Sequence, residues 1–428
     1  MRLVAAITIA LFAHAARAQP FEGPLSPVHA AAGWTELSGP DARQHWHLLG
    51  DSGFPTVVWS AESGEIRCTP NPRAGSGWDL VTTREFGDFE LVFQFKLSPK
   101  ANSGVKYLVD NTPGATQAFG PEYQVLDDAG TNTPADGEHA AGSLYDILPA
   151  GAAKKLLPPG EWNTARIRVR HGVTQHWLNG TKTIETRLSG PEWDALIADS
   201  KFKDSKSFAR APKGHIALQD HGGEVAYRNI RVRELDAALP SEVALFNGTS
   251  LEGWTPILND NGRAEDVWSV RDGVLICTGK PAGYIRTRPD FTNYVLRVVW
   301  RFDPVTKAAG NSGVLLRVIG EDKVWPRSVE AQLQSGAAGD FWNIGEFPMK
   351  TDDARRNGRN TRRTHTAERA IGEWNEYEIL VDHDRVTLFV NGEQLNAATD
   401  VLETSGAIAL QSEGAEIHFK TVRLAPIP

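Results

Sequence analysis

The sequence has little cysteine and no excess of basic charge, and each of these shortages excludes a class of protein. Only two of its 428 residues are cysteine, Cys68 and Cys277, which excludes a disulfide-rich scaffold. The 45 Lys and Arg residues are outnumbered by 53 Asp and Glu, giving a net charge of −8. Since neither half carries a dense basic stripe, nucleic acid is not an expected partner.

The sequence also lacks apolar runs long enough to span a membrane. The run from Leu3 to Ala13 follows Arg2 and precedes the small-residue triplet Ala16-Arg17-Ala18. This layout is typical of a Sec-type signal peptide, whereas a buried N-terminal helix would lack its cleavage-like triplet. We therefore predict that residues 1–18 are a signal peptide and that the protein is periplasmic or secreted. No cysteine follows the predicted cleavage site, so no lipid anchor is expected.

Cofactor motifs are missing as well. No Gly-rich phosphate loop, GxSxG elbow or dinucleotide-binding GxGxxG occurs, and no HExxH, CxxC or EF-hand spacing is present. The sequence therefore requires no cofactor. A divalent metal remains open, since carboxylates and an imidazole could supply ligands; these are Glu122, Asp127, Asp128, His139 and Asp146.

The sequence contains an internal tandem repeat. Asn102-Ser103-Gly104-Val105 recurs as Asn311-Ser312-Gly313-Val314, and further matches follow in the same order. They pair Gly160-Glu161-Trp162-Asn163 with Gly372-Glu373-Trp374-Asn375, Leu178-Asn179-Gly180 with Val390-Asn391-Gly392, and Ile216-Ala217-Leu218-Gln219 with Ile408-Ala409-Leu410-Gln411. We predict two tandem domains, residues 30–236 and 244–428, joined by a linker at 237–243.

The pattern within each copy predicts strands. Phe89 to Leu97 alternates apolar and polar residues, as a half-buried antiparallel strand does, and Asn179-Gly180 predicts a tight hairpin turn. Only 192–201, preceded by Pro191, has helical spacing. Many short strands per copy indicate an all-β fold of two jelly-roll sandwiches. Because Cys68 and Cys277 occupy equivalent strands of separate copies, we expect both to be buried free thiols.

The first copy keeps polar residues that the second has lost. Glu122 and Gln124, which share one face of a strand, are retained as Glu330 and Gln332. Other positions change, which favours a reactive site in the first copy. These are Asp127-Asp128, replaced by Ser335-Gly336, Lys106 by Leu315, His176 by Leu388, Asp220 by Ser412 and His221 by Glu413.

Several of these motifs closely resemble the 3-keto-disaccharide hydrolase family, which has a concanavalin-like or glucanase-like jelly roll. They are Asn102-Ser103-Gly104-Val105-Lys106-Tyr107, Glu122-Tyr123-Gln124-Val125-Leu126-Asp127-Asp128, Gly142-Ser143-Leu144-Tyr145-Asp146, Gly160-Glu161-Trp162-Asn163, His176-Trp177-Leu178-Asn179-Gly180 and Leu218-Gln219-Asp220-His221-Gly222. The resemblance is strong over residues 34–235 and weaker over 244–426. It implies action on glycosides already oxidised at C3 by a partner sugar 3-dehydrogenase.

A ketone at C3 acidifies the hydrogen on C2, so a base can remove it and the C1 substituent can leave by β-elimination. Water then adds back, giving net hydrolysis. Such chemistry needs a base, a donor to the enolate oxygen and an acid for the leaving group. Our candidate catalytic residues are Glu122, Asp127, Asp128, His176 and His221, and our candidate substrate-binding residues are Asn102, Lys106, Gln124, Tyr145, Asp146, Trp78 and Asp220.

Each candidate has a structural alternative. Glu122 and Gln124 could be sheet scaffolding, and Asp127-Asp128 could cap a turn. Either histidine could be a hydrogen-bonded structural residue, and Lys106 could merely extend from the sheet towards solvent. Most tryptophans are expected in the core, with Trp78 the best exposed candidate for stacking on a sugar.

The second copy has three possible roles. It could be a carbohydrate-binding module, a structural domain, or a second active site built from Glu330, Gln332, Arg317 and His365. Its basic segment, residues 355–363, is expected to be an irregular loop. For the whole protein, a lectin without catalysis is the main alternative to an enzyme. An ordinary glucanase is disfavoured because the sequence has no Glu-x-Asp-x-x-Glu strand motif.

Overall fold

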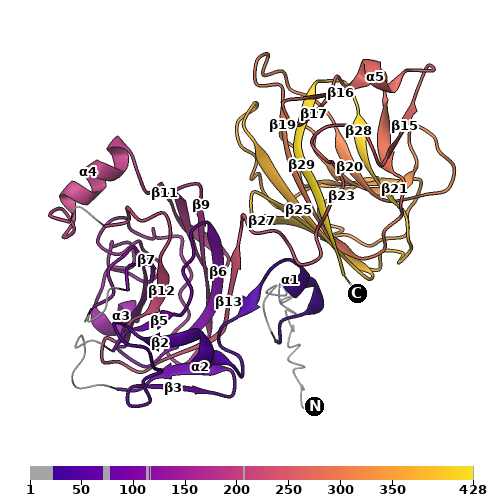
Figure 1. The fold of residues 1–428 in the computed structure, drawn as a ribbon. Coiled ribbons are helices and arrows are strands. Elements are labelled where there is room, and N and C mark those ends of the chain that lie inside the picture. Colours follow the sequence, from indigo (N-terminus) through magenta and orange to yellow (C-terminus); the bar gives the residue numbers. More distant parts are fainter. Residues whose placement is uncertain (1–22, 71–77, 112–114, 116, 206–207, 428) are drawn as a thin grey trace, which may run out of the picture. The chain divides into compact units, whose positions relative to one another are not determined.

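The chain folds into two compact units (Figure 1). The computed structural model describes residues 23–70, 78–111, 115, 117–205 and 208–427, so the predicted signal peptide lies outside the described residues. The first unit contains Trp34–Ala237, and the second contains Ser26–Gly33 together with the chain from Ala238 onward. Residues 30–33, which we had assigned to the first domain, thus belong to the second unit.

The first unit is a sandwich of two antiparallel sheets. One has the order β11 (Thr181–Arg187), β10 (Val173–Leu178), β9 (Asn163–Arg170), β6 (Phe89–Leu97), β13 (Val225–Glu234), β4 (Glu65–Cys68) and β3 (Trp59–Glu62), with β1 (Thr35–Glu36) also on β13. The other, the five-stranded sheet, has the order β2 (Trp46–Leu48), β5 (Leu80–Thr82), β12 (His215–Leu218), β7 (Asn102–Val109) and β8 (Glu122–Leu126).

The second unit repeats this jelly-roll plan. Its first sheet has the order β16 (Trp268–Arg271), β17 (Val274–Cys277), β29 (Ile417–Pro426), β19 (Tyr294–Phe302), β25 (Asn375–Asp382), β26 (Arg385–Val390) and β27 (Glu393–Ala398), with β14 (Val243–Ala244) on β29. Its second has the order β15 (Trp254–Leu258), β18 (Gly283–Thr287), β28 (Ala407–Ser412), β20 (Gly313–Ile319), β21 (Arg327–Gln332), β22 (Phe341–Ile344), β24 (Asn360–Thr361) and β23 (Arg356–Asn357).

Helices are short and few among the described residues. The longest confirms the helix predicted after Pro191, whose fixed φ suits a first helical position. None is long and apolar enough to cross a membrane. They are α1 (Pro27–Ala31), α2 (Ala42–His45), α3 (Asp128–Thr131), α4 (Pro191–Asp199) and α5 (Ala264–Val267).

Strand β6 shows how alternation builds the sandwich. Its predicted apolar face, from Phe89 to Leu97, belongs to the core of the first unit. The opposite face is also buried, which corrects the half-buried prediction. Glu90 lies there, 2% exposed, and its carboxylate accepts bonds from Arg166 and Arg233. Arginine side chains thus cover the face that the alternation alone assigned to solvent.

Other local predictions are confirmed. Cys68 and Cys277 are buried free thiols. Asn179 and Gly180 both have positive φ, 47° and 80°, as a type I′ hairpin turn requires. The basic segment 355–363 was wrongly expected to be irregular, because it contains the hairpin of β23 and β24. Three of its five arginines pair with acidic neighbours, Arg355 with Asp352, Arg356 with Asp353 and Arg363 with Asp340.

Candidate active site

A polar cavity of about 410 Å³ opens over the face of the five-stranded sheet that points away from the core. Strand β8 shows how the sheet supplies it. Tyr123 and Val125 point into the core, whereas Glu122 and Gln124 line the cavity, as the predicted alternation requires. The full lining is Asp79, Asn102, Lys106, Gln117, Ala118, Phe119, Gly120, Glu122, Gln124, Tyr145, Lys201, Phe202, Gln219, Asp220 and His221.

Glu122 is the most perturbed carboxyl group of the cavity. Its side chain lies across Gly104 on β7, where an added Cβ would come within 2.1 Å of the Glu122 carboxylate oxygen Oε1. Burial raises the Glu122 pKa to about 7, even though the charges of Lys106 and Lys201 lower it. A carboxyl group with this pKa exchanges a proton near neutral pH, as general acid–base chemistry requires.

Lys106 is held beside Glu122 by a buried anion. Lys106 Nζ lies 3.6 Å from Asp79 Oδ2 and donates to the Ala118 carbonyl at 3.1 Å. The Asp79 carboxylate accepts in turn from the backbone N–H groups of Asp220, at 3.0 Å, and Ala118, at 3.3 Å. The ammonium group is therefore fixed at the cavity wall rather than extended into solvent.

Tyr145 and Lys201 form a second part of the lining. Lys201 Nζ lies 4.1 Å from the centroid of the Tyr145 ring, and His139 stacks on that ring at 4.8 Å. Burial, with the nearby Glu122 and Asp146, raises the pKa of Tyr145, and burial lowers the pKa of Lys201. The phenol is therefore protonated at neutral pH and can donate a proton.

Asp146 does not line the cavity, but it holds the segments that carry Tyr145 and Lys201. Its carboxylate lies 2.8 Å from His139 Nε2 and accepts from the Lys201 backbone N–H at 2.7 Å. It thereby connects the loop that carries Tyr145 to the segment that carries Lys201. Of the two roles that the sequence suggests for Asp146, substrate binding and orientation of a neighbouring group, these contacts favour orientation.

The remaining predicted residues of the cavity are polar. Gln124 donates to Asn102 at 3.4 Å, and its own Oε1 is buried with no hydrogen-bond partner among the residues that the structure describes. Asp220 is buried and accepts from Gly222 N at 3.0 Å, whereas His221 is exposed at the cavity. Seven of the twelve predicted residues thus line the cavity, namely Asn102, Lys106, Glu122, Gln124, Tyr145, Asp220 and His221.

Asp127 and Asp128, predicted as catalytic, lie outside this lining. Asp127 is the N-cap of α3, accepting from Gly130 N at 3.1 Å and from Lys100 N at 2.8 Å. Asp128 is buried against Lys154, with 2.6 Å between Oδ2 and Nζ, and accepts from Ala141 N. These contacts match the turn-capping alternative.

His176 and Trp78 also lie outside it. His176 is fully buried, with Nε2 3.0 Å from the Tyr107 hydroxyl and its ring 5.0 Å from that of Tyr123. Burial lowers the His176 pKa to about 3, so the imidazole is neutral. Trp78 is half-buried against the core, and its carbonyl accepts from Trp59 Nε1.

Sequence reasoning missed two charged residues of the cavity. Asp79 could have been found by comparing the copies, because the β5 and β18 registers place Tyr284 at the equivalent position. Lys201 carries no such signal, since it follows α4 and reaches the cavity only through tertiary packing. Of the candidates in the second copy, Arg317 donates to backbone carbonyls and His365 contacts Glu393.

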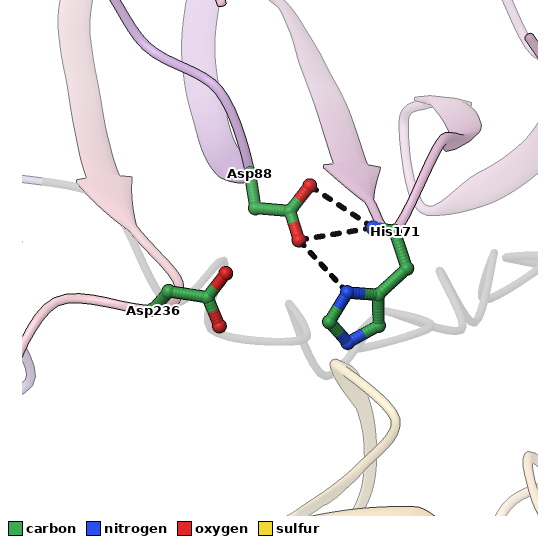
Figure 2. Close-up of side chains that lie close together, drawn as sticks. All are labelled: Asp88, His171 and Asp236. Atoms are coloured by element: carbon green, nitrogen blue, oxygen red, sulfur yellow. Dashed lines mark hydrogen bonds and ion pairs between the residues drawn. The ribbon is translucent and has the colours of Figure 1, made fainter. Parts of the chain in front are cut away.

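Three groups of possible metal ligands occur among the described residues, none of them in the cavity lining. In one, Asp88, His171 and Asp236 converge (Figure 2), but Asp88 already accepts from the His171 backbone N–H and pairs with Arg170. The second is Glu138, His139 and Asp146, next to Tyr145, and the third is Asp303, Glu416 and His418. The groups that face the cavity itself are suited to proton transfer and hydrogen bonding.

A β-sandwich whose sheet carries a polar cavity lined by acids, lysines and aromatic rings has the character of a carbohydrate-active protein. The sequence profile of the 3-keto-alpha-glucoside-1,2-lyase-like domain matches residues 31–233 and again 241–425. The chain therefore belongs to this family, with two copies of its domain.

Individual relatives are similar to one copy. A 3-keto-disaccharide hydrolase from Bacteroides thetaiotaomicron is 33% identical over 220 residues, which cover 45% of this chain and 74% of that protein. Two putative glycosyl hydrolase structures from Parabacteroides distasonis are also similar. One is 27% identical, covers 48% of this chain and 96% of its own, and has a TM-score of 0.42. The other is 26% identical, covers 47% and 99%, and has a TM-score of 0.36.

Proposed function

We propose that the first unit is an enzyme that cleaves 3-keto-glycosides by β-elimination followed by hydration. The observation that carries this proposal is Glu122, a buried carboxyl group with a pKa of about 7. It lies in a cavity that also contains two lysines and a protonated tyrosine. Family membership and the similarity to a 3-keto-disaccharide hydrolase support the choice of substrate.

In this mechanism Glu122 is the base. Its carboxylate removes the proton from C2 of the oxidised sugar, and the electron pair of that C–H bond moves towards the C3 carbonyl. The resulting enolate oxygen carries negative charge and needs a fixed cation or donor. Lys106, anchored by Asp79, is the proposed donor.

The C1–O bond then breaks, the enolate electrons form the C1–C2 double bond, and the C3 ketone is restored. Tyr145 is the proposed acid that gives the departing oxygen its proton, with the Lys201 cation beside it stabilising the phenolate that remains. Water then adds across the C1–C2 double bond, so that hydroxide bonds to C1 and a proton returns to C2. The net change is hydrolysis.

Elimination and hydration cause no net oxidation of the sugar. Another enzyme must therefore introduce the ketone at C3 of the substrate. We propose that a sugar 3-dehydrogenase supplies it. We also propose that residues 1–18 direct export, which would place the enzyme in the periplasm or outside the cell.

The test is to incubate the protein with a 3-keto-glucoside, and separately with the unoxidised glucoside, in deuterated water. We expect aglycone release only from the 3-keto compound, with deuterium incorporated at C2. Glu122→Gln should lower release by about 100-fold or more, the range of lost acid–base catalysis. Glu330→Gln, the equivalent change in the second unit, is the matched control and should leave release unchanged.

Cleavage of the unoxidised glucoside at a similar rate would contradict the proposal, as would release without C2 exchange. Binding of either sugar without release would favour the lectin alternative. Equal losses in Glu122→Gln and Glu330→Gln would show that the assignment to the first unit is wrong.

A further inference from the structure

The second unit has kept buried polar groups that its own fold does not satisfy. Glu330 is 5% exposed and Gln411 is 1% exposed. Among the described residues, neither Glu330 Oε1 nor either amide atom of Gln411 has a hydrogen-bond partner. Leaving such groups unpaired costs about 1–3 kcal/mol each. Native proteins keep few of them, and a ligand that pairs with them is one explanation.

These groups lie on neighbouring strands. Strands β28, β20 and β21 are consecutive in their sheet. Glu330 lies across Gly313 of β20, where an added Cβ would be 2.4 Å from Glu330 Oε1. The sequence therefore preserves in this unit the same glycine gap that accommodates Glu122 over Gly104.

An aromatic ring lies beside them, as Tyr145 lies beside Glu122 in the first unit, where Leu144 bridges to Tyr123 and the Tyr145 N–H donates to the Glu122 carbonyl. In the second unit the ring comes from strand β22, which continues the sheet beyond β21. Trp342 on β22 is directly opposite Glu330 in register, and paired residues share a face of the sheet. Its ring is half-exposed, and the exposed Arg359 guanidinium lies 5.9 Å from the ring centroid.

The chemistry of this face suits a neutral sugar. Burial and the nearby Glu413 raise the pKa of Glu330 to about 8, so the carboxyl group is mostly protonated at neutral pH. A carboxylic acid and an amide both donate and accept, which matches sugar hydroxyl groups. An indole face beside them provides an apolar surface for a pyranose ring.

The same face lacks the groups that we assign to cleavage. Leu315 stands where the first unit has Lys106, and Tyr284 stands where it has Asp79. Both belong to an apolar cluster with Val318, Ile344 and Ala409. The face therefore lacks the buried ammonium group that we assign to stabilising the enolate in the first unit, and the Arg359 guanidinium near Glu330 is exposed.

We propose that the second unit binds a neutral hexopyranoside on the face of β28, β20 and β21, through Trp342, Glu330 and Gln411, without cleaving it. This site is additional to the cavity of the first unit. Its expected role is to retain the protein on glycans that carry the unoxidised sugar.

Isothermal titration of the full chain with maltose tests the inference. Weak binding is expected in the wild type and in Glu122→Gln. Trp342→Ala should weaken it about tenfold or more, corresponding to loss of one aromatic contact. Release of aglycone from a 3-keto-glucoside should be unchanged in Trp342→Ala. Gly313→Ala, which displaces Glu330 without touching Trp342, provides a second variant, and unchanged thermal unfolding of either variant excludes misfolding.

The inference is overturned if maltose binding survives both Trp342→Ala and Gly313→Ala, or disappears in Glu122→Gln. Absence of binding to maltose and to methyl glucoside overturns it too. Binding of methyl glucuronide with no binding of methyl glucoside would show that Arg359 selects an acidic sugar and that the neutral assignment is wrong.

Discussion

At the scale of single residues, the proposed chemistry depends on one carboxyl group being held away from water. Glu122 is 7% exposed, and burial is the main cause of its raised pKa. The positive charges of Lys106 and Lys201 lower the Glu122 pKa, so it stays near 7 instead of rising further. A base tuned in this way is ionised for part of the population at physiological pH and strong enough to accept a proton.

The first prediction concerns pH. If Glu122 is the base, kcat/KM for a 3-keto-glucoside should fall about tenfold per pH unit below pH 7, because only the carboxylate form reacts. Above pH 7 the value should level off until the acid is lost. Initial rates between pH 5 and 9 measure this, and a flat profile across pH 7 would rule out Glu122 in that role.

The second prediction concerns Gly104. Alanine at this position places a Cβ 2.1 Å from Glu122 Oε1, so the carboxyl group must move. A displacement of this size should lower kcat by about 100-fold, since misplacement by an ångström has that effect. Steady-state kinetics measures it. Gly313→Ala makes the same change in the second unit and should leave kcat unaltered; an equal loss would contradict the assignment.

The sequence predicted the residues that depend on local pattern. Alternation on β8 placed Glu122 and Gln124 on one face, and the structure puts both in the cavity. Comparison of the two copies predicted catalytic residues less reliably, because a polar residue can be replaced in one copy for reasons of packing alone. His176 and the equivalent Leu388 are both fully buried, and the histidine contacts Tyr107 inside the sandwich instead of the cavity. Nothing local distinguishes that change from loss of a catalytic group.

At the scale of elements, the first unit joins its strands with charged side chains. Glu90 on β6 is paired with Arg233 on β13 and with Arg166 on β9. Burial opposes ionisation of Glu90, yet these arginines lower its pKa to about 2. Strand pattern alone could not predict this, because the register that brings the arginines together is set by long-range pairing.

The third prediction is that Glu90→Gln destabilises the first unit by about 3–5 kcal/mol at pH 7, because it removes the buried carboxylate that pairs with Arg166 and Arg233. Since the native pKa lies below the usual value, the stabilisation is complete above pH 4.5 and is lost as the pH falls towards 2. Urea unfolding at several pH values measures both effects. Glu185→Gln, at an exposed ion pair with Lys182, is the control and should change stability by less than about 0.5 kcal/mol. Equal effects of the two changes would contradict the argument.

At the scale of the whole molecule, each unit has its own hydrophobic core. One core is built around β6 and the other around β19, and they share no residue. Leu91 and Leu296 occupy equivalent positions on these strands, and both are fully buried. The two units should therefore respond separately to core mutations.

The fourth prediction follows from these separate cores. Leu296→Ala should destabilise the second unit by about 2–5 kcal/mol through the cavity it leaves. Calorimetry should show one unfolding transition lowered, with 3-keto-glucoside cleavage unchanged below that transition. Leu91→Ala, in the equivalent place, should lower the other transition. Simultaneous loss of both transitions in either variant would show that the units unfold as one.

The helix α1 has a consequence for how the chain is made. Val28 and Ala32 are 6% and 1% exposed, and the Ala32 carbonyl accepts from Arg297 of the second unit's β19. This segment is translated before the first sandwich, whereas its partner strand β19 is translated after it, roughly 13–53 s later at about 5–20 residues per second. For that interval its apolar side chains have no native cover. A nascent-chain chaperone would find a binding place there, and the second sandwich is completed only when β19 meets this earlier segment of the chain.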